Sequence, residues 1–212
     1  MPDEDPEQAA AREDLCRWLA ACYYEPDAVL AEEKVFDAMA SAADRLDAEL
    51  GAGARRLGDA FAAAGLPALV ADYQRLFVGP GEPLARPLGF AWLGDGEPPA
   101  AQASTIALEG LYAEAGFEID EEAGEVPDHV ALELEFLYLL THKGNEARRG
   151  GHQEVIAGWA QLHSLFLAGH LGAWIGRFAA AVIANAETAF YRELAALTAR
   201  FVQTGVERLS RR

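Results

Sequence analysis

Positively charged residues are scarce in this chain of 212 residues. Lysine and arginine together number 17 against 34 aspartates and glutamates, so the formal net charge is −17 and the pI is about 4.6. Only Lys34 and Lys143 are lysines. Proteins that bind nucleic acids or anionic membranes gain affinity mainly by neutralising phosphate with basic side chains. The charge balance therefore argues against both classes, and we expect no nucleic-acid partner.

Cysteines and long apolar runs are also lacking. On a helix, Cys16 and Cys22 would lie roughly 9 Å apart and on different faces, so we expect neither a redox pair nor a disulfide. The N-terminus is acidic where a secretory signal peptide would be basic and then apolar, and no uninterrupted apolar run of about 18 residues follows. We therefore expect a cytoplasmic protein without stable membrane insertion.

Clusters of valine, isoleucine and threonine, which mark strands, are missing as well. Alanine, the strongest helix former, accounts for 44 residues instead. With 51% hydrophobic and 24% charged residues, the composition is that of a globular protein, and the length fits one domain or two small ones. We predict an all-α fold, a single-domain multi-helix bundle over residues 1–212, with residues 1–8 flexible.

The spacing of apolar residues and the positions of glycine and proline divide the chain into predicted helices. Gly51 and Gly53 are expected to end the second helix and to separate it from a short one, which ends before Gly65. Apart from that short helix, the predicted helices are Pro6–Tyr24, the second helix Pro26–Leu50, Leu66–Val78, Ala100–Gly116, one that opens at Pro127, Gly151–Ala168, His170–Ala186 and Glu187–Arg211.

Residues 79–99 contain five glycines and five prolines, too many helix breakers for regular structure. An ordered but irregular stretch of this length in a compact domain usually serves a function. Trp92 lies in this predicted loop and is the tryptophan best placed for a binding surface. Trp18, Trp159 and Trp174 are expected to pack in the core or between helices.

Enzymatic motifs are weak. Gly79-Pro-Gly81 lacks the lysine and hydroxyl residue of a phosphate-binding loop and is interpreted as a tight turn, and no G-x-S-x-G nucleophile motif occurs. His129 and Glu133, four residues apart on one helix face, could supply two metal ligands, or Glu133 could orient the imidazole. A metal-dependent hydrolase using this pair is therefore an alternative. Asp128 could simply complement the positive end of the helix dipole.

Four motifs in a fixed order resemble the TorD/DmsD family of cytoplasmic redox-enzyme maturation chaperones, over roughly Leu15 to Phe201. The motifs are Tyr73-Gln-Arg-Leu-Phe-Val-Gly-Pro-Gly81, Glu125-Val-Pro-Asp-His129 followed by Glu133-Leu134, His170-Leu-Gly-Ala-Trp174, and Phe190-Tyr191.

This resemblance implies an all-helical, non-enzymatic protein, either a monomer or a domain-swapped homodimer. Such a chaperone binds the precursor of a molybdopterin-containing oxidoreductase of the dimethyl-sulfoxide-reductase family. It recognises the twin-arginine signal peptide and holds the apoenzyme until the cofactor is inserted, which delays export. No cofactor or metal of its own is implied. A helical interaction protein without a precursor client is the remaining alternative.

The resemblance also implies a signal-peptide-binding groove with an apolar and a polar part. The implied residues are Tyr23, Leu76, Phe77, Pro87, Trp92, Asp128 and His129. Asp128 would pair with a guanidinium of the leader, while the acidic run 118–125 either steers the leader or is a solvated connector. Leu88 replaces a frequent aromatic and Phe90 a frequent small polar residue, so we expect a groove of different shape and leader preference.

Overall fold

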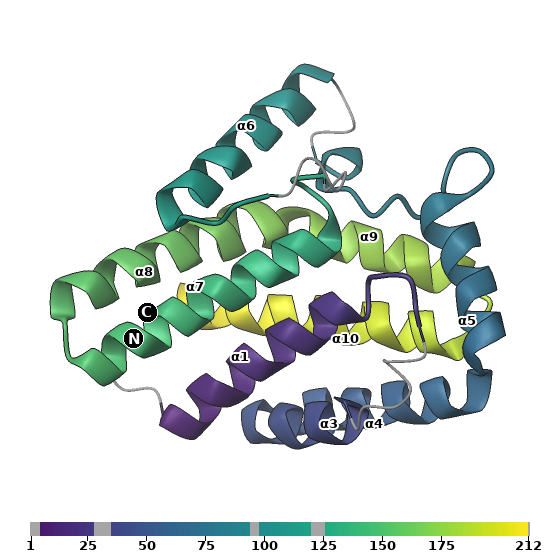
Figure 1. The fold of residues 1–212 in the computed structure, drawn as a ribbon, viewed down its shortest axis with the longest axis horizontal. Helices are drawn as coiled ribbons and strands as arrows, with labels where there is room; N and C mark the ends of the chain where they lie inside the picture. Colours follow the sequence, from purple (N-terminus) through teal and green to yellow (C-terminus); the bar gives the residue numbers. More distant parts are fainter. Residues whose placement is uncertain (1–4, 28–34, 94–97, 120–125, 212) are drawn as a thin grey trace.

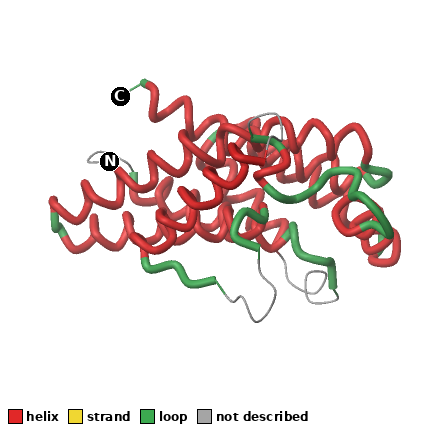
Figure 2. The backbone as a smooth tube through the Cα atoms, turned by 90° about the horizontal axis from the view of Figure 1, so that it is seen from above, coloured by secondary structure: helices red, strands yellow, loops and turns green. Residues whose placement is uncertain are grey.

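The computed structural model of the chain describes residues 5–27, 35–93, 98–119 and 126–211. Helix forms 81% of the backbone in these ranges, and no strand occurs in them (Figure 2). The all-α class and the single multi-helix domain predicted from the sequence are confirmed. One isolated antiparallel bridge, between Leu88 and His129, pairs two non-helical segments.

The elements differ in length and in helix type. The α-helices are α1 (Pro6–Ala21), α3 (Val35–Leu46), α4 (Ala48–Ala64), α5 (Leu66–Tyr73), α6 (Pro98–Ala115), α7 (Val130–Gly150), α8 (Gln153–Phe166), α9 (Gly172–Asn185) and α10 (Ala189–Ser210). The shorter turns are the π-helical η1 (Gln74–Val78), the 3-10 helical η2 (Gly89–Ala91) and the π-helical η4 (Leu167–Leu171).

Helix α7 runs through the middle of the molecule and packs against α1 and α8 (Figure 1). Helix α10 packs against α9 and α4, and α3 contacts both α4 and α1, which closes the bundle. Helix α6 crosses at the edge, and its main contacts among the described elements are small ones with α8 and η2. The stretch from Val130 to Leu140, in which only Glu133 and Glu135 are charged, is buried at most positions.

The predicted second helix, Pro26–Leu50, was expected to end at Leu50, and this predicted end is wrong. The described part, α3, stops at Leu46, and α4 starts at Ala48, because Asp47 accepts hydrogen bonds from the backbone N–H groups of Glu49 (2.8 Å) and Leu50 (3.3 Å). Gly51 and Gly53 lie inside α4 and do not end a helix.

These glycines serve helix packing. A Cβ atom on Gly51 would collide with the side chain of Asp44, and one on Gly53 would lie 3.2 Å from Leu197 Cδ1 on α10. Glycine was interpreted as a breaker from local pattern alone, whereas here it allows close approach.

The break predicted between Ala168 and His170 is also absent. Helix α8, the π turn η4 and α9 form one helical segment, Gln153–Asn185. By length and composition this segment could cross a membrane, but half of its most apolar window is buried inside the fold. Core helices of globular proteins can be equally long and apolar. We therefore assign this segment to the core of the bundle on the basis of its packing.

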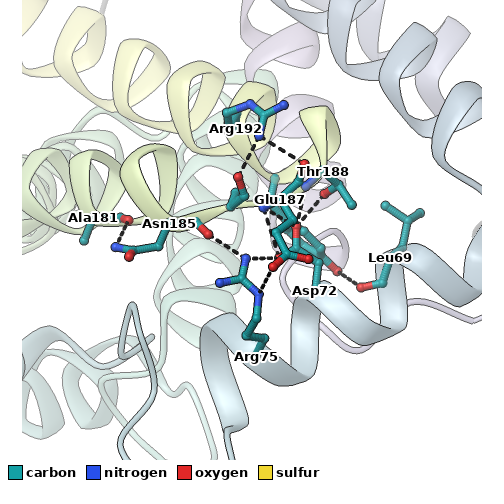
Figure 3. Close-up of polar contacts among 10 residues, drawn as sticks. Leu69, Asp72, Arg75, Ala181, Asn185, Glu187, Thr188 and Arg192 are labelled. Atoms are coloured by element: carbon teal, nitrogen blue, oxygen red, sulfur yellow. Dashed lines mark hydrogen bonds and ion pairs between the residues drawn. The ribbon is translucent and has the colours of Figure 1, made fainter.

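The predicted helix over residues 66–78 is confirmed as α5 followed by η1, and a buried carboxylate joins it to α10 (Figure 3). Asp72 is 2% exposed and accepts hydrogen bonds from the backbone N–H groups of Glu187 (3.1 Å) and Thr188 (2.7 Å) and from the Thr188 hydroxyl (2.8 Å). Arg75 donates to the same carboxylate (2.6 Å) and to the backbone oxygen of Asn185 (2.5 Å). Asp72 therefore anchors the two residues directly before α10 to α5.

Candidate functional site

The irregular loop is fastened to the start of α7 by backbone and side-chain hydrogen bonds. Gly89 N–H donates to the Asp128 backbone oxygen (2.8 Å), and Val130 N–H donates to the Pro87 oxygen (2.9 Å). The Asp128 carboxylate accepts from Phe90 N–H (2.8 Å). Two segments about 40 residues apart in the sequence thus form one local structure.

The interpretation of Asp128 as a first-turn residue of the helix is wrong. Helix α7 starts at Val130, and its N-cap is His129, whose Nδ1 accepts a hydrogen bond from Ala131 N–H (3.2 Å). Asp128 is 3% exposed and faces the loop. Burial raises the pKa of its carboxyl group, and the Phe90 N–H offsets part of that rise.

His129 is a neutral hydrogen-bond acceptor at the helix start. Burial lowers the pKa of its imidazole to about 4, so the ring carries no charge at neutral pH. The hydrogen bond from Ala131 to Nδ1 requires that nitrogen to be unprotonated, so the ring proton resides on Nε2.

A buried polar cluster lies beneath the loop. Glu133 has no exposed surface, accepts a hydrogen bond from Trp174 Nε1 (3.1 Å) and pairs with His170 Nε2 (2.9 Å). Burial raises the pKa of Glu133, whereas for His170 the hydrogen bond and charge of Glu133 outweigh burial, so its pKa is raised too. The other His170 nitrogen lies 3.4 Å from the Ser104 hydroxyl on α6.

This cluster changes the interpretation of the His129 and Glu133 pair. The Glu133 carboxylate binds His170 and Trp174, not His129. Within the described residues, no group of three or more histidines, cysteines or acidic residues is arranged to hold a metal ion. The metal-hydrolase alternative therefore finds no support in this part of the chain.

Gly89 is the contact point between the loop and the buried cluster. A Cβ atom at this position would lie 3.0 Å from Glu133 Oε1 and 3.2 Å from Trp174 Nε1, closer than side chains ordinarily pack. The loop can rest on the cluster only because residue 89 has no side chain. Trp174 was expected to pack in the core, and it is fully buried. His170 and Gly89 were assigned no role from the sequence, although His170 lies in a motif that carried the family resemblance.

The implied apolar residues lie mostly in the core below the loop. Tyr23, Leu76 and Phe77 are at most 5% exposed, and Pro87 is buried. Their surfaces are covered in this conformation, so peptide contact at these four positions stays a prediction. Trp92 is half-buried and donates from Nε1 to the Arg86 backbone oxygen (2.8 Å).

One residue that the sequence did not single out connects this group. The ring of Phe178 on α9 lies 5.8 Å from that of Tyr23 and 6.1 Å from those of Phe77 and Trp92. Phe178 thus lies next to Tyr23 and Phe77 of the implied groove and next to Trp92 of the loop. A bulky side chain at position 178 supports the loop from below.

The outer face of the loop is hollowed and partly apolar. The lining residues are Glu82, Pro83, Leu84, Arg86, Phe90, Ala91 and Trp92. Leu84 is 45% exposed, and Arg86 lies over the Phe90 ring at 5.7 Å. Of the implied apolar residues, only Trp92 lines this hollow. Residues 120–125 of the acidic run lie outside the described residues.

Residues 43–180, more than half of the chain, match the family described as nitrate reductase delta subunit. The chain belongs to this family. It is similar to the perchlorate reductase assembly chaperone protein of Dechloromonas aromatica, with 32% identity over 104 residues, 49% of this chain and 46% of that protein. It is also similar to the chaperone protein TorD of Vibrio parahaemolyticus, with 28% identity over 137 residues, 63% of this chain and 60% of that protein. The chain thus spans about half of the length of these relatives, and membership of the TorD/DmsD family is confirmed.

Proposed function

We propose that this protein is a non-enzymatic chaperone for the precursor of a molybdopterin-containing oxidoreductase. Membership of the nitrate reductase delta subunit family and the likeness to two named chaperones support this role. The chaperone would hold the apoenzyme until the cofactor is inserted and thereby delay its export. It would carry no cofactor of its own.

The loop of residues 82–92 is the proposed contact surface for the client's twin-arginine leader. Such a leader has a basic segment followed by an apolar one, so its receptor needs an apolar hollow near acidic groups. The observation that supports this place is the hydrogen bond from Phe90 N–H to Asp128, because it holds Phe90 and Trp92 at the hollow. The apolar part of the leader would contact these two rings and Leu84.

The arginines of the leader would first meet the one acidic residue that lines the hollow, Glu82, which pairs with Arg86 at 3.5 Å. The Glu82 side chain is 84% exposed and lines the hollow, whereas Asp128 is buried. Because Asp128 is only 3% exposed beneath the loop, a guanidinium could reach its carboxylate only if the loop moved. We therefore propose that Asp128 and His129 act first by holding the loop, and that direct pairing with Asp128 requires the loop to move.

The test is a calorimetric titration with a synthetic twin-arginine leader of the molybdoenzyme encoded nearest to this protein. The double variant Asp128→Ala with His129→Ala should bind at least about tenfold more weakly, while circular dichroism shows an unchanged helical fold. Asp59→Ala, which removes an exposed acid on α4, is the matched control and should bind like the wild type.

Three results would contradict all or part of this proposal. Unchanged affinity of the double variant would remove Asp128 and His129 from the site. A folded wild-type protein that ignores the leader but binds the mature apoenzyme would place recognition on the apoenzyme alone. Absence of binding to both would reject this client.

Location and assembly belong to the same proposal. We place the chaperone in the cytoplasm, because its client would receive its cofactor before export, and we expect no stable membrane insertion. Both a monomer and a domain-swapped homodimer suit the role. Light scattering on the purified protein, with and without leader, would distinguish them.

A further inference from the structure

The hollow on the outer face of the loop contains a cation of the protein's own. Its charged lining residues are Glu82 and Arg86, so the formal charges of the lining cancel. Like charges repel at short range, so a fixed cation at this place would oppose the binding of a basic peptide. A surface that only attracted arginines would not hold a guanidinium there.

The Arg86 side chain contacts both kinds of group that the hollow offers to a guanidinium. Its Nη2 lies 3.5 Å from Oε1 of Glu82, and its guanidinium carbon lies 5.7 Å from the centre of the Phe90 ring. Carboxylates and aromatic faces are the groups that bind guanidinium in proteins. Arg86 thus occupies the acid and the ring that an arginine of the leader would use.

The backbone at Arg86 is held independently of its side chain. Trp92 donates from Nε1 to the Arg86 backbone oxygen (2.8 Å), and the N–H group of the preceding residue, Ala85, donates to the Leu76 backbone oxygen (2.9 Å). These hydrogen bonds tie the loop backbone to Trp92 and to η1. The Arg86 side chain can therefore leave the hollow while the backbone stays in place.

The contacts of the Arg86 side chain are of a kind that exchanges readily. The Glu82 side chain is 84% exposed and that of Arg86 is 36% exposed. Ion pairs and cation–π contacts at exposed positions contribute little net free energy, because water competes for the charges. A second guanidinium that a bound peptide holds at the hollow can therefore replace that of Arg86.

We propose that Arg86 is a placeholder for an arginine of the leader. In the free protein its guanidinium pairs with Glu82 and covers the Phe90 ring. On binding, an arginine of the leader takes over both contacts, and Arg86 turns toward solvent. This inference rests on the proposed function, because it concerns the same hollow and the same leader.

The exchange gives the hollow a means of discrimination between peptides. Where the leader carries arginine, one guanidinium replaces another, and both Glu82 and the Phe90 ring keep a cationic partner. Where the leader carries a neutral residue instead, Arg86 keeps its place, and the peptide contacts only the rest of the hollow. Without Arg86, a leader arginine would gain the two contacts without displacing a competitor.

The experiment is a double-mutant cycle on the full chain, measured by calorimetric titration. The protein is the wild type or Arg86→Gln, and the peptide is the synthetic twin-arginine leader or the same leader with both arginines changed to glutamine. Arg86→Gln keeps the backbone oxygen to which Trp92 donates. The variant should bind the twin-arginine leader at least about fivefold more tightly, and its affinity for the glutamine leader should change by less than about twofold.

Arg17→Gln is the matched control for the removed charge. Arg17 of α1 also pairs with an acid, Asp14 at 3.3 Å, and lies over an aromatic ring, that of Trp18 at 5.5 Å. It does not line the hollow. Long-range attraction alone would make the two variants bind the leader alike, whereas the exchange predicts a gain for Arg86→Gln only.

Equal or weaker binding of the twin-arginine leader by Arg86→Gln would overturn the placeholder role and leave the leader site in place. So would an equal gain for both peptides, because the leader arginines would then not be the groups that replace Arg86. An equal gain for Arg17→Gln would also overturn it. Absence of leader binding by the folded wild type and by folded Arg86→Gln would instead reject the leader site, and the placeholder role with it.

Discussion

At the scale of single residues, the candidate site depends on a glycine, Gly89, as much as on its polar groups. Gly89 places the loop directly on the pair formed by Glu133 and Trp174. Asp128 then receives the N–H of the next residue, Phe90. A small displacement of the backbone at position 89 would therefore move the loop away from its anchor.

Replacing Gly89 with alanine should disturb both stability and binding. The added methyl group would press on two buried side chains, which costs about 1–3 kcal/mol of unfolding free energy as in other overpacked cores. Because the loop would shift, leader affinity should fall as well. Urea denaturation and leader titration measure the two effects.

Gly81 provides the matched control in the same loop. A Cβ atom there would have no neighbour within 4 Å, so Gly81→Ala should leave both quantities near wild type. Equal behaviour of the two variants would show that contact with the buried cluster does not position the loop.

The buried imidazole of His129 predicts a loss of stability in mild acid. The pKa of a histidine in an unfolded chain is about 6.5, and in the folded protein that of His129 is about 4. Between these values the unfolded state binds a proton that the folded state does not, so stability falls as pH falls from about 6.5 to about 4. Above about 6.5 this group contributes no pH dependence.

His129→Asn isolates that contribution. Asparagine is a good N-cap residue and can still accept a hydrogen bond from a backbone N–H, but it does not titrate. The variant should therefore lose less stability than the wild type between about pH 6.5 and pH 4 in urea denaturation. His170, whose pKa shifts in the opposite direction, is present in both proteins and cancels. If the unfolding free energies of the two proteins changed with pH in parallel, His129 would not be a buried, neutral imidazole.

At the scale of elements, local pattern predicted the helices whose ends are marked by residues with a special backbone role. α5 with η1 was placed at its observed ends, because proline, glycine and apolar spacing agree there. Prediction failed at Gly51 and Gly53, which serve contacts with other residues. Local sequence does not distinguish a glycine that ends a helix from one that lets two helices approach.

The same limit applies to the candidate site. The family resemblance pointed to Asp128 and His129, and both lie at the loop. Their local partners, however, depend on the path of a loop about 40 residues earlier in the chain, which no helical periodicity encodes. Burial of Tyr23 and Phe77 around Phe178 likewise follows from the meeting of the turn after α1 with η1 and α9, not from any one of these segments.

The junction of α5 and α10 is the element contact with the clearest energetic prediction. Asp72→Ala would leave the N–H groups of Glu187 and Thr188 and the Arg75 guanidinium without their shared acceptor. We expect a loss on the order of 2–4 kcal/mol of unfolding free energy, since unpaired buried polar groups are costly. Asp72→Asn, which keeps an acceptor oxygen, should lose less.

The control for this prediction is an acid of the same type without such contacts. Asp59→Ala on the exposed face of α4 should change stability by less than about 0.5 kcal/mol. If Asp72→Ala were equally mild, the carboxylate would not be what joins the two elements.

At the scale of the whole molecule, the net charge of −17 and the apolar hollow contribute in different ways to the binding of a basic, partly apolar peptide. Long-range attraction raises the association rate and is screened by salt, whereas apolar contact is not. The acidic surface therefore favours encounter with a leader, and the hollow decides how long the complex persists.

Salt dependence separates these two contributions. From about 0.1 M to about 1 M salt the Debye length falls from about 10 Å to about 3 Å, so the association rate for the leader should fall by at least about tenfold. The dissociation rate should change little, because it reflects contacts of Leu84, Phe90 and Trp92 that salt does not screen. Stopped-flow kinetics of a fluorescent leader measures both rates.

A leader with both arginines changed to glutamine is the control: it should associate slowly at either salt concentration yet dissociate at a similar rate. If salt instead accelerated dissociation and left association unchanged, short-range ion pairs in the bound complex would hold the leader, and the loop would have to move to expose Asp128.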